Sequence, residues 1–186
     1  MKFLPALALT LPLVAAAAPV SYTLDPEHTI PRFEVLHNSF SAHMGSFMKA
    51  AGKATLDMAD KSGSVEVTIE SASLLTGHAF MEGIVKDKDF FNVKEFPVMT
   101  FKSRRITFQG DKPAQVEGDF TMIGVTRPLT LTFTYFNCGQ HPRTKKEQCG
   151  GNLTGQIKRS DFGMKAYIPA VADDVRLLIQ VEAFKD

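Results

Sequence analysis

Between Val116 and Tyr135 the chain reads V-E-G-D-F-T-M-I-G-V-T-R-P-L-T-L-T-F-T-Y, and this pattern indicates a β-sheet protein. Apolar and polar residues alternate on both sides of a break at Gly124, as expected for strands with one buried face and one solvated face. The apolar set is Val116, Gly118, Phe120 and Met122 before the break, and Leu129, Leu131, Phe133 and Tyr135 after it. The break carries glycine and proline, which are typical turn residues.

The same period of two recurs along the chain. It is clear at 33–37, 65–69 and 175–183, and shorter stretches at 45–56, 98–108 and 151–158 also suit strands. About eight antiparallel strands close naturally into a small barrel that holds one ligand. One short helical segment is predicted at His78–Lys88, and the apolar residues of 78–96 suggest a flap over a barrel opening. The predicted fold class is therefore an all-β, roughly eight-stranded antiparallel barrel with one short helix.

The first 17 residues have the pattern of a cleavable signal peptide. Lys2 precedes an apolar run, and small residues follow, with the Ala17–Ala18 bond as the expected cleavage site. We therefore expect export to the periplasm, with residues 18–186 forming one domain. Loss of Lys2 takes the formal net charge from +1 to zero. A neutral chain lacks the basic excess that nucleic-acid binding requires.

Two cysteines, Cys138 and Cys149, lie close together in the sequence. In an oxidising compartment this spacing favours a disulfide that pins one loop. A metal pair and a redox-active dithiol fit less well, because the spacing is not CxxC and only His141 lies nearby.

The barrel interior is predicted to be aromatic and incompletely filled. The chain has 15 Phe, 3 Tyr and no Trp. An ordinary packed core is the simpler interpretation, but Gly52, Gly118 and Gly155 fall on inward faces. Small residues beside large aromatic ones would leave apolar volume, and such a void suits an apolar ligand.

Seven motifs follow one another along the chain: Tyr22-Thr-Leu-Asp-Pro-Glu-His28-Thr, Phe33-Glu-Val-Leu-His37, Gly45-Ser-Phe47 with Gly52, Asp89-Phe-Phe-Asn-Val93, Phe96-Pro-Val-Met-Thr-Phe101, Gly118-Asp-Phe-Thr-Met-Ile-Gly-Val-Thr-Arg-Pro128 and Arg159-Ser-Asp-Phe-Gly-Met164. Together they resemble the YceI-like family. The resemblance covers nearly all of the chain after the signal peptide. It implies an exported, lipocalin-like barrel that binds a polyisoprenoid or an isoprenoid quinone. Met81 and Glu82 stand where family members often carry Arg-Asp, so the head-group preference here is open.

The expected function is binding and carriage of a long isoprenoid lipid, without catalysis and without a covalent cofactor. The expected ligand-binding residues are Phe33, Val35, His37, Phe47, Phe90, Phe91, Phe101, Phe120, Met122, Leu131 and Phe133. His37 could hydrogen-bond a quinone carbonyl or satisfy a buried backbone group. The alternative function is an enzyme or stress-response factor acting on a lipid or its oxidised products.

Neither a metal site nor an active site is predicted. A zinc site would need His28, His37, His43 and His78 to converge, and the helical spacing typical of zinc enzymes is absent. The chain also lacks a Gly-x-Ser-x-Gly elbow and a Gly-rich phosphate loop. Transient contact with a membrane or membrane protein, and a homodimer, remain open.

Overall fold

The computed structural model describes residues 18–186, and the predicted signal peptide lies outside the described residues. The strands are β1 Val20–Leu24, β2 Ile30–His37, β3 Ser41–Phe47, β4 Ala50–Asp57, β5 Ser62–Glu70, β6 Leu74–Leu75, β7 Val98–Gln109, β8 Lys112–Met122, β9 Val125–Gln140, β10 Glu147–Lys158 and β11 Val171–Lys185. The helix α1 spans Ala79–Lys86, and 3₁₀ turns η1 and η2 span Ser71–Ser73 and Arg159–Phe162. Among these residues no helix is long and apolar enough to cross a membrane.

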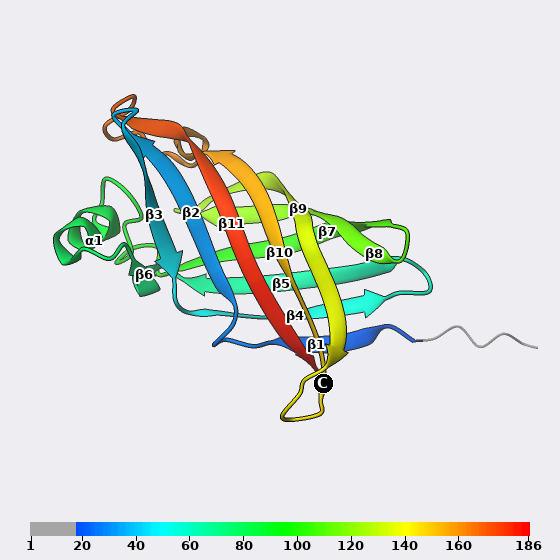
Figure 1. The fold of residues 1–186 in the computed structure, drawn as a ribbon. Helices are drawn as coiled ribbons and strands as arrows, with labels where there is room; N and C mark the ends of the chain where they lie inside the picture. The colour runs from blue at the N-terminus through cyan, green and yellow to red at the C-terminus, as the bar shows by residue number, and fades with distance from the viewer. Residues whose placement is uncertain (1–17) are drawn as a thin grey trace, which may run out of the picture.

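The sheet closes into a barrel because β1 pairs with a strand on each side. Val20 lies opposite Leu56 of β4, and Tyr22 lies opposite Lys185 of β11. The ring runs β1-β4-β5-β7-β8-β9-β10-β11, all antiparallel, and then returns to β1 (Figure 1). The predicted eight-stranded antiparallel barrel is confirmed.

Three strands lie outside the closed ring, each next to a ring strand in the sequence: β2 follows β1, β3 precedes β4 and β6 follows β5. β2 continues along the edge of β11 beyond β1, pairs with β3, and β3 pairs with β6. Thr29 fixes the bend between β1 and β2: its Oγ1 donates to the Glu182 carbonyl at 3.1 Å and accepts from the Glu182 amide at 3.3 Å. The bends carry the sheet past the closed ring and flare it at one end.

The flared end is covered by an insert, not by strand pairing. β6 pairs with β3, and no pairing to β7 is found among the described residues. The chain between them, residues 76–97, carries α1 and stands beside this end of the barrel (Figure 1). The predicted helical segment is confirmed, and we call this end the mouth.

The opposite end is tied by a disulfide and by polar contacts. Cys138 and Cys149 are bonded and lie directly opposite each other in β9 and β10. The predicted disulfide is confirmed, although it joins two paired strands and not the ends of an open loop. Nearby, the Tyr22 hydroxyl donates to Glu147 Oε1 at 2.9 Å. Burial and this carboxylate raise the pKa of Tyr22 to about 12.

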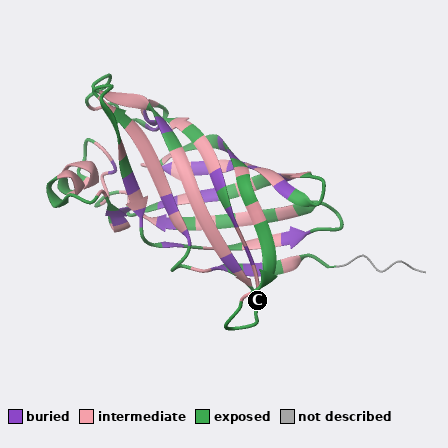
Figure 2. Cartoon of the chain, viewed as in Figure 1, coloured by how far each residue is buried: buried purple, intermediate pink, exposed green. Residues whose placement is uncertain are grey.

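Burial alternates along the strands as the sequence predicts (Figure 2). Val116, Phe120 and Met122 are all buried in β8. Tyr135 is a correction, because it is 60% exposed although the pattern placed it inside. The register shifts there: Leu153 pairs with Phe133, but Asn152 pairs with Tyr135. One extra residue in β9 reverses the facing of the residues beyond it.

Candidate functional site

The barrel encloses two apolar cavities, each of about 120 Å³. The mouth-side cavity lies toward α1, and the deep cavity lies toward the disulfide. No polar atom is exposed to either one. Apolar cavities of this size stay dry and accept small apolar molecules.

The two cavities are compartments of one lumen because they share a wall. The residues lining both are Leu24, Val67, Phe101, Leu131, Ile179 and Val181. Phe101 has the largest side chain of this set and is only 6% exposed. Phe101 is therefore the largest side chain in the wall that the two compartments share, and we call it the septum.

The inward glycines do not create this space, which corrects the sequence interpretation. A Cβ on Gly118 would overlap the Lys102 carbonyl oxygen and lie 2.7 Å from the Phe101 ring. A Cβ on Gly155 would lie 2.8 Å from a methyl group of Leu131. These positions are small because a neighbouring strand or ring occupies the volume, so the glycines permit close packing.

Three phenylalanines separate the lumen from the mouth. Phe33, Phe47 and Phe91 form a mutually packed trio with ring centroids 5.3 to 6.1 Å apart. We call this trio the aromatic gate. Gly45, opposite Phe33 in β3, makes room for it, because a Cβ there would overlap the Phe33 ring. Phe33 lines both the mouth-side cavity and the space beyond the gate.

That space is a vestibule of about 740 Å³ between β2, β3, α1 and the loop after η2. Its apolar wall includes Met44, Phe80, Met81, Ile84, Val85 and Phe90, and its polar wall includes His37, Thr76, His43 and His78. The rings of His37 and His43 pack at a centroid distance of 4.7 Å. Phe90 stacks on Tyr167 at 6.0 Å. The vestibule therefore offers hydrogen-bonding groups beside an apolar surface.

Arg159 organises the vestibule wall and was not singled out from the sequence. It is 2% exposed, and its guanidinium lies 5.9 Å from the centre of the Phe90 ring. Desolvation lowers the pKa of Arg159, while Asp173 opposes the shift. All three side-chain nitrogens donate to backbone carbonyls at 2.8 to 3.1 Å, those of Met164, Ala166, Val171 and Ala172. A guanidinium fork suits this role, and a lysine could not replace it.

Most of the residues predicted to bind ligand lie around the lumen and the vestibule. The mouth-side cavity is lined by Phe47, Phe91, Phe101, Phe120, Met122 and Leu131. Phe133 lines the deep cavity, and Phe33 lies at the gate. The vestibule is lined by His37 and Phe90. Val35 is half-buried and lines none of these spaces. His37 therefore lies outside the gate, in the wall of the vestibule.

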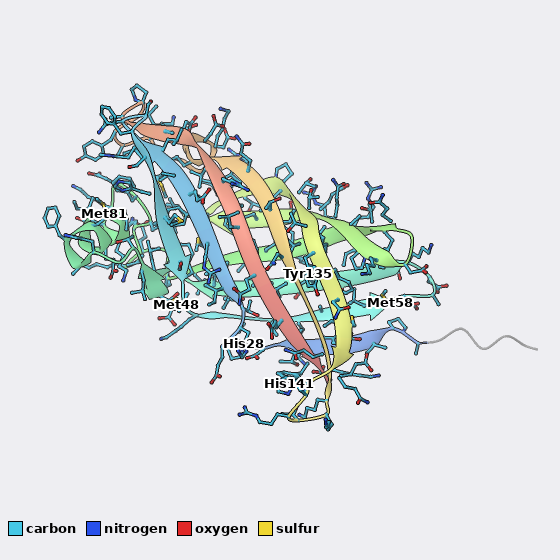
Figure 3. The ribbon with its side chains drawn as sticks, in the orientation of Figure 1. His28, Met48, Met58, Met81, Tyr135 and His141 are labelled. Atoms are coloured by element: carbon cyan, nitrogen blue, oxygen red, sulfur yellow. A yellow bond between two sulfur atoms is a disulfide. The ribbon has the colours of Figure 1, made fainter. Side chains whose placement is uncertain are left out.

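The four histidines considered for zinc do not come together. His37, His43 and His78 line the vestibule, whereas His28 lies at the bend between β1 and β2, away from Met81 of α1 (Figure 3). His28 Nδ1 is 2.6 Å from Asp25 Oδ2. Among the described residues, the group with metal-binding geometry is Asp25, His28 and Glu182, with ligand atoms within 4.8 Å of one another.

The hydrogen bond between His28 and Asp25 affects both groups. The pKa of His28 is raised by this bond and by the Asp25 charge. Partial burial would raise the pKa of Asp25, but hydrogen bonds from His28 and the Glu27 amide lower it instead. An imidazolium–carboxylate pair explains the geometry and is consistent with a structural turn.

The departure from the family motif also has a defined place. Met81 lines the vestibule. Glu82 faces the insert: its Oε1 accepts from the Thr76 amide at 3.0 Å, and its Oε2 lies 4.0 Å from Lys86 Nζ. At this position the vestibule wall therefore carries a thioether, and the neighbouring carboxylate is turned away from it.

A closed antiparallel barrel with a dry lumen, a gate and a vestibule defines the class of lipocalin-like cavity barrels. A family model, the YceI-like domain, matches residues 22–183. The chain belongs to the YceI-like family. It is 34% identical to a UPF0312 protein of Pseudomonas putida (strain GB-1), over 99% of this chain and 97% of the relative. It is 32% identical to Protein YceI of Salmonella newport (strain SL254), over 90% of this chain and 88% of the relative.

Solved structures share the fold. BcnA of Burkholderia cenocepacia superposes with a TM-score of 0.68 at 26% identity, over 86% of this chain and 98% of that one. The YceI protein of Campylobacter jejuni gives 0.68 at 28% identity, over 81% and 90%. A polyisoprenoid-binding domain from Saccharophagus degradans gives 0.62 at 14% identity, over 90% and 99%, a likeness that concerns the fold alone.

Proposed function

We propose that this protein binds an isoprenoid lipid, either a prenyl chain or an isoprenoid quinone, and carries it through the periplasm without transforming it. One observation carries the proposal: a dry, wholly apolar lumen is separated by a phenylalanine gate from a vestibule with polar groups. The tail would occupy the lumen, and the head group would remain in the vestibule. The Saccharophagus domain, which shares the fold, is named for polyisoprenoid binding, and this supports the proposal.

The size of the lumen limits how the tail is held. A cavity of about 150 Å³ accepts benzene. Each compartment of about 120 Å³ therefore offers room for a fragment about as large as one isoprene unit. A longer tail would have to displace the septum and the gate rings, so we infer that the lumen widens as the lipid enters.

The lining favours carriage over chemistry. No polar atom of the described residues is exposed in either cavity, so no general acid or base reaches a tail held there. Removing a prenyl tail from water contributes about 25 cal/mol per Å² of apolar area. Affinity should therefore come from the tail and depend little on salt.

The test is to extract the purified periplasmic protein for mass spectrometry and to titrate the emptied protein with prenyl alcohols of increasing length. We expect a co-purified isoprenoid and an affinity that rises with each isoprene unit until the lumen is full. A flat response to tail length, or turnover of an added lipid, would overturn the proposal.

Two neighbouring positions in β9 give a matched pair of variants. Leu131 is buried and lines both cavities, whereas Thr132 is exposed. Leu131→Phe should fill part of the lumen and weaken binding of long tails most. Thr132→Phe adds a larger apolar group outside the barrel and should leave tail binding unchanged.

A further inference from the structure

Large apolar side chains are exposed at the mouth of the barrel. Phe40 is 91% exposed, Phe80 is 73%, Tyr167 is 64% and Met44 is 61%. They come from four segments: the turn between β2 and β3, the strand β3, the helix α1, and the loop after η2. We call these four residues the mouth rim. Three of them, Met44, Phe80 and Tyr167, also line the vestibule, so the rim surrounds the entrance to the proposed lipid site.

The most exposed rim residue is held outward by a fixed backbone. Asn38 and Ser39 both have positive φ, at 49° and 58°, which turns the chain tightly before Phe40. The Asn38 amide donates to the Ala170 carbonyl at 2.6 Å, and the Phe40 amide donates to the His37 carbonyl at 3.0 Å. The turn is therefore hydrogen-bonded to the loop after η2, but the Phe40 side chain remains almost fully exposed. Such exposed apolar side chains mark interaction sites.

The charge of the rim segments selects the kind of partner. Residues 35–48 and 162–172 contain no aspartate or glutamate, and their single formally charged residue is Lys165. Glu82 of α1 accepts a hydrogen bond from the Thr76 amide and forms an ion pair with Lys86. Across the whole insert, 76–96, three lysines face two aspartates and two glutamates, so the insert carries a formal charge of −1 that Lys165 offsets. A rim that is apolar and, together with the insert, formally neutral suits the surface of a phospholipid bilayer.

We propose that the mouth rim docks on the surface of a phospholipid bilayer. Docking places the vestibule against the acyl region, so that a prenyl chain passes between bilayer and lumen without crossing water. This inference rests on the proposed function, because it names the route by which that ligand is loaded and released. Four exposed side chains give a reversible contact and not permanent insertion.

The experiment is flotation of the purified protein with vesicles of phosphatidylethanolamine and phosphatidylglycerol, and with vesicles of pure phosphatidylcholine. We expect binding to both kinds of vesicle, with little dependence on added salt. Phe40→Ser and Phe80→Ser should each reduce the vesicle affinity roughly tenfold, which corresponds to losing one inserted aromatic side chain. Met44→Ser should reduce it by a smaller factor.

Two exposed residues away from the mouth serve as matched controls. Tyr135 is 60% exposed on the outer face of β9, and Met58 is 42% exposed in the turn after β4. Figure 3 shows both well away from Met81 of α1. Tyr135→Ser and Met58→Ser remove comparable apolar surface, so they should leave vesicle binding unchanged. Equal losses in the control and rim variants would overturn the proposal.

The remaining outcomes separate this inference from the proposed function. A protein that binds prenyl alcohols in solution but never floats with vesicles would keep its function and lose the docking surface. A protein that floats with vesicles but binds no isoprenoid would retain the docking surface and lose the function. Rim variants that change only self-association in sedimentation, or only capture of a partner protein, would overturn bilayer docking.

Discussion

Replacing the septum, Phe101→Ala, should join the two cavities into one long lumen. Phe101 is 6% exposed, and truncating a buried phenylalanine costs 3–5 kcal/mol. The cost here should lie near the lower limit, about 3 kcal/mol, because the ring already faces a cavity of about 120 Å³ on each side. Those empty faces mean that the ring has fewer packing contacts to lose.

The same change should strengthen the binding of long tails. A merged lumen can take one more isoprene unit, or five carbons, at an ideal gain of about 0.8 kcal/mol for each CH₂. Because the cavity walls are already dry, we expect about half of that sum, about 2 kcal/mol, or roughly a thirtyfold lower Kd. Short prenyl alcohols that already fit the mouth-side cavity should gain little.

The assay combines urea unfolding of the emptied protein with titration of prenyl alcohols of several lengths. Phe108→Ala is the matched control, since Phe108 lies on the same strand and is half-buried but lines neither cavity. It should reduce stability without changing the dependence on tail length. The reasoning is refuted if Phe101→Ala weakens all tails equally, or if both variants change the dependence on tail length alike.

Three further predictions follow from the fold. Phe120→Asp should lower the free energy of unfolding by several kcal/mol through an unpaired charge in the lumen, while Thr121→Asp on the outer face should be mild; equal Tm shifts would contradict the facing of β8. Replacing both cysteines by serine should cost roughly 2–3 kcal/mol in urea melts and leave the circular dichroism of the barrel intact. His28→Asn should cost more Tm near pH 6 than near pH 8. The pKa of His28 is raised by Asp25, so its stabilisation is complete below the unfolded pKa of about 6.5 and is lost as pH rises through the folded pKa. An unchanged cost at both pH values would remove His28 as the titrating group.

The barrel was predictable because its strands obey one local rule. From Val116 to Met122 of β8 and from Val175 to Ala183 of β11, every second residue faces inward, and a period of two is visible without knowledge of tertiary contacts. The rule fails where the ladder itself is irregular. The extra residue in β9 has no local signature, so Tyr135 was placed inside, while Phe136 in fact lines the deep cavity. Which side chains point inward beyond a bulge depends on how the strand pairs with its neighbour.

The residue pattern predicted a candidate site in the barrel interior, but not its division into two cavities, a gate and a vestibule. Alternation and clustered phenylalanines identified Phe47, Phe91 and Phe120, because any inward aromatic residue of a small barrel reaches the lumen. The inward glycines were misinterpreted, since only the structure shows that neighbouring atoms already fill their space. Arg159 was missed because its partners are backbone carbonyls of a folded loop, which no residue pattern reveals. Its place in the Arg-Ser-Asp-Phe motif was the available signal.

The two ends of the barrel differ in what must break before a lipid can pass. At the end opposite the mouth, passage would have to disrupt the β1–β11 ladder, the contact of Tyr22 with Glu147 and a covalent disulfide. At the mouth no ladder joins β6 to β7, and α1 has no buried residue. Moving the insert and rotating the gate rings breaks packing contacts but few hydrogen bonds, so opening the barrel requires the least free energy at the mouth. The rates at which a lipid enters and leaves should therefore depend on the insert and the gate. Its equilibrium affinity should depend on the lumen behind them, because only the lumen residues stay in contact with the tail once the mouth has closed.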